Sequence, residues 1–266
     1  MTIILAAEKL TKTFATGKRE ILTVLQDVSF EVQEGEFVCI LGASGCGKST
    51  LLNIFAGFLQ PSQGIARLRE QVITGIEPRC GMVFQSYALF PWKTVRSNIE
   101  FGLKMQKLAS SERRKRAASF IDLVKLTGFE EHYPAELSGG MQQRVSLARS
   151  LAADPQVLLM DEPFAALDAM TRQVLQEELL RIHAESRKTV LFITHSIDEA
   201  LILSNRIIIL SARPGRVKAV INNDLPLPRH IEIQLSPDYA RLKKQVWSLV
   251  AEEIRKHGEA GISSEK

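Results

Sequence analysis

The sequence has few of the features that mark membrane-spanning, secreted or disulfide-stabilised proteins. No uninterrupted apolar run approaches the roughly 18 residues of a membrane-spanning helix, and the N-terminus lacks a charged segment followed by an apolar block and a cleavage site. Three cysteines occur, Cys39, Cys46 and Cys80, and their number and spacing fit neither a disulfide framework nor a zinc site. We therefore expect a protein that is neither membrane-spanning nor secreted and that works in a reducing cytoplasm.

A strong charge bias and a nucleic-acid-binding motif are also missing. The formal net charge is only +4 over 266 residues, and no segment interleaves aromatic and basic residues as RNA-binding motifs do. We expect no nucleic-acid partner. The densest basic cluster, residues 112–116, is interpreted as a solvated helix face, with a membrane-proximal or partner surface as the alternative. With 45% apolar and 24% charged residues, the chain can form a globular domain with a substantial core.

Apolar runs and turn residues predict an α/β core into which a helical segment is inserted. Helical patterns cover Val95–Gln106, Ser111–Leu126 and Met141–Ala153, so a helical subdomain is expected over about residues 86–155. Several expected strands are apolar throughout, as buried parallel strands tend to be. The expected strands of the core are Phe37–Leu41, Met82–Phe84, Val157–Met160, Val190–Thr194 and Ile207–Leu210.

The two ends of the chain have different patterns. Ile3–Leu10, Leu22–Leu25 and Val28–Val32 predict a small antiparallel β subdomain at the N-terminus. Near the C-terminus, the expected strand Val217–Ile221 is followed by a proline-rich link and a helix over about Pro237–Lys256. We expect one domain over residues 1–230 and a helical extension over 231–266 that packs on it; a partner-binding helix is the alternative.

The stretch GASGCGKST, Gly42–Thr50, matches the phosphate-binding P-loop pattern and stands where that loop should, after a strand and before a helix. Its backbone N–H groups and the helix N-terminus favour phosphate. Lys48 should reach the β- and γ-phosphates, and the Ser49 hydroxyl should bind Mg2+. The residues expected to contact the nucleotide are Gly42, Ser44, Gly45, Cys46, Gly47, Lys48, Ser49 and Thr50. For Cys46, the alternative is that it is only a small side chain tolerated at a spacer position of the loop.

Two further segments indicate how a bound nucleotide is used. The apolar strand Val157–Met160 ends in Asp161 and Glu162, where acidic groups can reach a phosphate pocket. Asp161 is predicted to hold Mg2+ through water, and Glu162 to polarise the attacking water as general base. Upstream, Ser138, Gly139 and Gly140 precede an expected helix and form an anion-binding end; a plain helix cap is the alternative.

Together, these motifs closely resemble those of ATP-binding cassette (ABC) ATPases, and the resemblance covers nearly the whole chain. It implies an ABC-type P-loop core that binds ATP and Mg2+ and hydrolyses ATP, in which Ser138, Gly139 and Gly140 reach the ATP held by a second subunit. Gln85 matches the Q-loop glutamine, a Mg2+ and water contact. Asp168, in Ala166–Asp168, matches the D-loop at the dimer interface, and His195 matches the switch histidine. A surface polar group is the alternative for Gln85, and a helix-cap neighbour for His195.

Four positions depart from the common pattern of the family without removing a catalytic group. Phe14 corresponds to the aromatic residue that stacks on adenine, where tyrosine is common, and burial in the N-terminal sheet is its alternative. Ala43 replaces a frequent proline, and Ala165 and Ala166 replace frequent serine or glycine. Hydrolysis with Lys48, Gln85, Glu162 and His195 as the catalytic set therefore stays the expectation.

The segments Phe90–Ile99 and Ser211–Val217 resemble those of bacterial importers for nitrate, taurine and other sulfonates. The resemblance implies a peripheral subunit at the cytoplasmic face of the inner membrane, paired with a second copy, bound to permease subunits and served by a solute-binding protein. Pro91 and Trp92 would lie near the permease; the alternative is a turn with a packed indole. For residues 213–216, the alternative to an importer-specific role is a plain charged β-turn. An exporter cassette and an ATP-dependent switch outside transport remain the alternative functions.

Overall fold

The computed structural model describes residues 2–17 and 20–262 and forms two compact units. The first unit is built from the described chain up to Glu77 together with the described chain from Thr189 onward, and the second from Pro78–Lys188. Within the described ranges, no helix combines the length and the apolar character needed to cross a bilayer.

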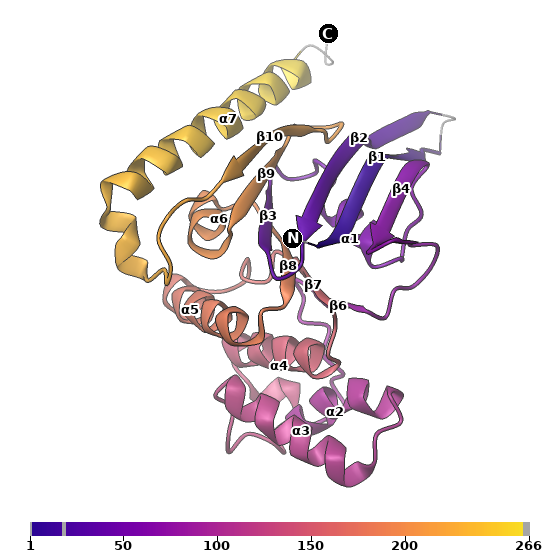
Figure 1. Ribbon diagram of the computed structural model, residues 1–266, viewed down its shortest axis with the longest axis vertical. Helices are drawn as coiled ribbons and strands as arrows, with labels where there is room; N and C mark the ends of the chain where they lie inside the picture. The colour runs from indigo at the N-terminus through magenta and orange to yellow at the C-terminus, as the bar shows by residue number, and fades with distance from the viewer. Residues whose placement is uncertain (1, 18–19, 263–266) are drawn as a thin grey trace. The chain divides into compact units, whose positions relative to one another are not determined.

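An antiparallel sheet with the strand order β2-β1-β4-β5 begins the first unit (Figure 1). Strands β1 (Ile3–Ala15) and β2 (Ile21–Gln33) pair along their whole length, and β4 (Gln63–Leu68) and β5 (Gln71–Val72) extend the sheet. The predicted antiparallel subdomain is confirmed. The prediction of two short strands between residues 22 and 32 was wrong, because Asp27 takes a left-handed conformation (φ 51°) inside one continuous strand.

The first unit also contains four neighbouring strands in the order β10-β9-β3-β8. Strand β3 (Phe37–Leu41) runs parallel to β8 (Thr189–Thr194) and β9 (Arg206–Leu210), and β10 (Val217–Asn222) pairs antiparallel with β9. Every residue of β3 and β8 is buried, which explains the apolar sequence of β3 and the apolar run between the two threonines of β8. Helix α1 (Lys48–Phe55) follows β3 and helix α6 (Ile197–Leu203) follows β8.

The C-terminal helix α7 (Pro237–Ile262) follows a 3-10 turn at Ile231–Leu235 and packs on the first unit. Its predicted apolar face is confirmed, since Tyr239, Leu242 and Val246 are buried. The Tyr239 hydroxyl donates to Asp198 Oδ1 of α6 at 2.5 Å, and Lys243 Nζ lies 2.6 Å from the same oxygen. Burial and the bond to Asp198 raise the pKa of Tyr239. Helix α7 is therefore held against α6 by both apolar and polar contacts.

The second unit gathers helices α2 (Val95–Met105), α3 (Ser110–Leu123) and α4 (Gly139–Ala152) beside one another (Figure 1). It also contains the parallel strand pair β6 (Cys80–Val83) and β7 (Val157–Asp161), a 3-10 turn at Pro134–Glu136 and the helix α5 (Ala169–Ser186). The helical stretches predicted between residues 95 and 153 are confirmed.

Glu178 on α5 is a buried carboxylate with two cationic partners. Its side chain is 4% exposed, and it lies 2.8 Å from Lys125 Nζ and 2.5 Å from Arg181 Nη2. Burial alone would raise the pKa of Glu178, but the hydrogen bonds from Arg181 and Lys125 outweigh it, so the pKa is lowered. This ion group joins α5 to the segment that follows α3.

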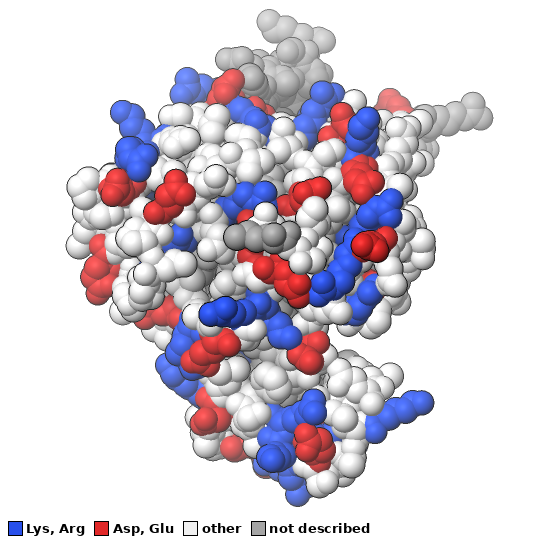
Figure 2. Space-filling model, in the orientation of Figure 1, with Lys and Arg blue, Asp and Glu red and all other residues white. Residues whose placement is uncertain are grey.

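The surface carries charges of both signs. Figure 2 shows basic and acidic side chains interspersed over the face in view. In the basic cluster on α3, Arg116 Nε pairs with Glu112 Oε1 at 2.8 Å one helical turn away, and each side chain is a little under half exposed. This arrangement favours the solvated helix face over a dedicated basic binding surface.

Helix α4 begins earlier than the sequence pattern predicts. It begins at Gly139 instead of Met141, so Gly139 and Gly140 lie inside its first turn. The Ser138 hydroxyl accepts a hydrogen bond from the Met141 N–H at 3.3 Å and caps α4. The cap determines where the helix starts and overrides the low helix propensity of glycine.

Candidate nucleotide site

The phosphate loop connects β3 to α1 and is closed by its own lysine. Lys48 is 5% exposed, and its Nζ donates to the carbonyl oxygens of Gly42 at 2.9 Å and Ala43 at 3.1 Å. Ser44, Gly45 and Ser49 are exposed, Thr50 is half-buried, and Cys46 and Gly47 are buried. The loop thus presents backbone and hydroxyl groups to solvent above a buried cation.

Gly47 is required at the point where the loop becomes the helix. Its φ of 101° is a left-handed conformation, and a Cβ atom there would lie 2.6 Å from Leu25 Cδ2 and 3.1 Å from the Val24 carbonyl oxygen. A side chain would therefore be both strained and in collision with β2. The close approach of β2 explains why the loop needs glycine before Lys48.

His195 leaves the strand beside the one that leads into the phosphate loop. Strands β3 and β8 are parallel, and their last residues, Leu41 and Thr194, are partners in the ladder. Gly42 and His195 therefore follow neighbouring strand ends. His195 is exposed and precedes Ser196, whose hydroxyl caps α6 by accepting from the Glu199 N–H at 3.3 Å. The position fits a phosphate-sensing side chain as well as a neighbour of the cap.

The second unit brings Gln85 and the two acidic residues together in the same way. Strands β6 and β7 are parallel with Val83 opposite Met160, so Gln85 follows one strand end, while Asp161 ends and Glu162 follows its neighbour. Gln85 is exposed, and Asp161 and Glu162 are half-buried. Glu162 has a φ of 44°, an uncommon conformation for a residue with a side chain. Backbone strain of this kind gathers at functional positions.

Arg149 of α4 holds the backbone directly after Gln85, a contact that the sequence analysis did not predict. Tyr87 and Ala88 both take left-handed conformations, with φ of 59° and 47°. The Arg149 guanidinium donates to the Ala88 oxygen at 2.7 Å and to the Tyr87 oxygen at 3.2 Å. Burial lowers the pKa of Arg149. The helix that Ser138 caps thus also fixes the strained turn that follows Gln85.

The segment Ser138–Gly140 lies at the N-terminus of α4, where N–H groups and the helix dipole favour an anion. Ser138 and Gly139 are exposed, and Gly140 is buried. Asp168 is exposed at the N-terminus of α5 and accepts a hydrogen bond from the Thr171 N–H at 3.0 Å. This hydrogen bond lowers the pKa of Asp168. Both segments present polar groups to the surface.

Two aromatic residues that the sequence analysis singled out are exposed. The Phe14 ring is 37% exposed on β1 with Lys12 Nζ 5.2 Å from its centroid, so the alternative of burial in the sheet is wrong. The Trp92 side chain is 70% exposed and its ring centroid lies 5.8 Å from that of Phe90. Phe14 can offer a flat face to a base, and Trp92 can offer an apolar surface to a partner.

The donor set expected for Mg2+ has suitable chemistry. Ser49, Gln85 and Asp161 supply a hydroxyl, an amide and a carboxylate oxygen, the hard ligands that Mg2+ takes together with phosphate oxygens. Over the described part of the chain, no three His, Cys, Asp or Glu side chains gather as a metal cluster. All three cysteines are thiols.

Comparison with known proteins identifies an ABC transporter family model and import ATP-binding proteins as similar to this chain. The family model described as "ABC transporter" matches residues 25–165. The nitrate import ATP-binding protein NrtD of Synechocystis sp. is 44% identical over 88% of this chain and 90% of its own length. The aliphatic sulfonates import ATP-binding protein SsuB of Bacillus cereus is 46% identical over 84% of this chain and 86% of its own length.

Among solved structures, the chain is similar to an ATP-binding cassette described as dimeric, in a post-hydrolysis state and bound to ADP and Pi. The sequence identity is 35% and the TM-score 0.74, over 83% of this chain and 99% of that one.

Proposed function

The chain belongs to the ABC transporter family, and from this premise we propose that it is the ATP-hydrolysing subunit of an importer for a small anionic solute, either nitrate or a sulfonate. The observation that carries the proposal is the similarity to NrtD and SsuB over most of each chain. Both relatives are named for import, which disfavours an exporter cassette. The presence of Glu162 and His195 disfavours a switch that binds ATP without hydrolysing it.

We propose that Phe14 stacks on adenine and that the phosphate loop binds the phosphates through its N–H groups and Lys48. His195, which follows the strand next to the loop, then contacts the γ-phosphate. Ser49, Gln85 and Asp161 would hold Mg2+, which would neutralise charge on the phosphate oxygens. Glu162 orients the attacking water and accepts its proton, and Gln85 contacts the same water.

We propose that two copies of the chain share each ATP. Ser138, Gly139 and Gly140 of one copy would complete the site built on Lys48 of the other, and Asp168 would lie at the interface. The exposure of Ser138 and Gly139 at the start of α4 and of Asp168 at the start of α5 supports this assignment, because these groups are accessible to a second chain. The dimeric relative of known structure supports it as well. Closure on ATP and reopening after hydrolysis would drive the permease between two states.

We propose that the subunit works at the cytoplasmic face of the inner membrane, bound to permease subunits that receive solute from a solute-binding protein. The exposed Trp92, next to Pro91 and packed on Phe90, offers an apolar surface for the permease. We also propose that residues 1–230 form the ATPase domain, with a helical subdomain over about 86–155, and that residues 231–266 form a C-terminal extension.

An uptake assay tests the function. Cells lacking the gene for this chain but retaining their permease genes would receive the wild-type chain or Glu162→Gln, and uptake of labelled nitrate and taurine would be measured. The proposal expects uptake of one anion with the wild-type chain and background uptake with the variant. Equal uptake of both anions in cells with and without the wild-type chain would overturn it.

A further inference from the structure

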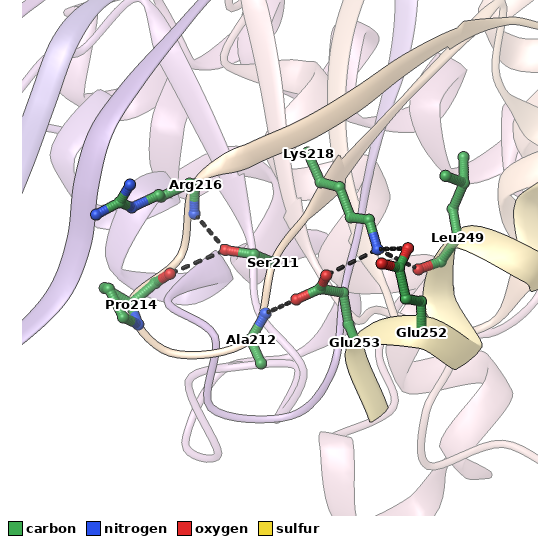
Figure 3. A network of polar contacts seen from close by, with 8 residues as sticks. All are labelled: Ser211, Ala212, Pro214, Arg216, Lys218, Leu249, Glu252 and Glu253. Atoms are coloured by element: carbon green, nitrogen blue, oxygen red, sulfur yellow. Dashed lines mark hydrogen bonds and ion pairs between the residues drawn. The ribbon is translucent and has the colours of Figure 1, made fainter. Parts of the chain in front are cut away.

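The loop Ser211–Arg216, which joins β9 to β10, is closed by its own hydrogen bonds (Figure 3). The Ser211 hydroxyl donates to the Pro214 oxygen at 2.9 Å and accepts from the Arg216 N–H at 2.9 Å. The Ser211 N–H also donates to the Arg216 oxygen at 2.9 Å. These bonds fix the loop as a single rigid turn, which is more than the charged β-turn that the sequence suggested.

One side of this turn lies on the phosphate loop. Arg213 Nε and Nη2 each lie 3.2 Å from the carbonyl oxygen of Gly45. A Cβ atom at Gly215 would lie 2.2 Å from the Cys46 oxygen, so only glycine permits this close approach. Gly215 is also bound to β2, with its N–H 2.8 Å from the Val24 oxygen. The turn is thus packed between β2 and the phosphate loop.

The other side of the turn is bound to α7. The Ala212 N–H donates to Glu253 Oε2 at 3.0 Å, directly before Arg213 (Figure 3). Glu253 Oε1 lies 2.7 Å from Lys218 Nζ, which also contacts Glu252 Oε2 at 2.6 Å and the Leu249 oxygen at 3.0 Å. A continuous series of polar contacts therefore connects the C-terminal helix, the turn and the phosphate loop.

The contact with Gly45 affects the groups that bind phosphate. A peptide unit is planar and trans, so the Gly45 carbonyl and the Cys46 N–H point in opposite directions from one rigid plane. The Cys46 N–H donates to the Ala43 oxygen at 3.3 Å, so the peptide is held at its N–H by a long backbone hydrogen bond and at its oxygen by Arg213. The guanidinium therefore helps to fix the direction of the Cys46 N–H, and it adds positive charge beside the loop.

We propose that Arg213 is a positioning residue for ATP binding, which orients the Gly45–Cys46 peptide of the phosphate loop, and that α7 holds Arg213 in place through Glu253. The inference concerns nucleotide binding by this chain and does not depend on which solute the transporter carries. In this proposal, the role of the C-terminal helix is to support the phosphate loop through the turn that carries Arg213.

The test compares two arginines of the same turn. Arg213→Ala removes the contact with Gly45, whereas Arg216→Ala removes a hydrogen bond to Gln26 Oε1 at 2.6 Å and leaves the phosphate loop contact intact. Each full-length variant would be assayed for KM and kcat of ATP hydrolysis and for the Kd of a fluorescent ATP analogue, with thermal melting as the check on folding.

Arg213→Ala is expected to raise KM and Kd about 10-fold, the scale of one charge-assisted hydrogen bond, with kcat within about twofold. Arg213→Lys should recover part of the loss because it keeps one donor and the charge, and Arg216→Ala should leave KM and Kd unchanged. An unchanged Kd in Arg213→Ala, or equal losses in both alanine variants, would overturn the role of Arg213.

The role of α7 is tested with the neighbouring pair Glu253→Ala and Glu252→Ala. Both variants remove a carboxylate that contacts Lys218, but only Glu253 also accepts from Ala212. Glu253→Ala is expected to raise KM several-fold in the same direction as Arg213→Ala, while Glu252→Ala is not. Identical KM values for the two glutamate variants would refute the connection through Glu253.

Discussion

Replacement of Arg229 by methionine tests how the C-terminal segment is fixed to the first unit. Arg229 is 4% exposed and donates five hydrogen bonds to four carbonyl oxygens, those of Ile202, Ser204, Asn223 and Leu225. Two of these carbonyls lie at the C-terminal end of α6 and two in the link after β10. The guanidinium therefore joins the helix that follows His195 to the link that leads to α7.

The magnitude follows from two opposing terms. Burial lowers the pKa of Arg229 from the ordinary value of a guanidinium to about 10, and at about 1.4 kcal/mol per pKa unit this corresponds to a cost of about 3 kcal/mol for the charged form. Hydrogen bonds from a charged donor contribute about 1.5 kcal/mol each or more, so four occupied carbonyls contribute about 6 kcal/mol. The net stabilisation that Arg229→Met removes is about 3 kcal/mol.

The assay is thermal unfolding followed by circular dichroism, with Arg241→Met as the matched control. Arg241 lies on α7 with a side chain that is 70% exposed and pairs with Asp238 at 3.3 Å. A loss of about 3 kcal/mol lowers Tm by about 6 to 12 °C in a chain of this size, whereas an exposed pair contributes little. A Tm of Arg229→Met equal to or above that of the wild type would refute the reasoning, because methionine would then replace the buried charge without loss.

The remaining predictions concern turnover and acid stability. Glu162→Gln should still bind ATP, with kcat reduced about 10²- to 10⁴-fold, because an amide cannot accept the proton of the attacking water; wild-type turnover would exclude the general-base role. Glu178, whose pKa is lowered by Arg181 and Lys125, contributes stability above its unfolded pKa of about 4.5 that is lost as the pH falls through its folded pKa. In Glu178→Gln, Tm should therefore fall less between pH 6 and pH 3 than in the wild type. An equal fall in Tm in the two proteins would contradict the pairing.

The main strands and the phosphate loop could be predicted because their signals are local. Strands such as β3 and β8 are buried throughout, so an unbroken apolar run is enough to identify them. The phosphate loop has a fixed spacing of glycines, Lys48 and Ser49 that backbone geometry imposes. Boundaries were less accurate where a single contact decides them, as at Ser138, whose side-chain cap starts α4 two residues before the predicted start at Met141.

Contacts between distant parts of the chain could not be predicted in this way. Arg149 binds carbonyls 61 and 62 residues away, and Arg213 binds Gly45 across 168 residues. In the sequence both are ordinary arginines, because the acceptors are backbone oxygens that any residue carries. The strands β4 and β5 were also missed, since six and two residues beside turns give little periodicity.

The shared ATP site is tested most directly by mixing two inactive variants. Lys48→Ala removes the phosphate-loop cation but keeps Ser138, whereas Ser138→Arg blocks the start of α4 but keeps Lys48. If each ATP lies between two copies, a mixed dimer contains one intact site. If the two variants pair at random in equal amounts, half of the dimers are mixed, and each mixed dimer carries one intact site of two. The mixture should then recover ATPase activity to about a quarter of the wild-type rate. A mixture as inactive as its separate components would contradict the account.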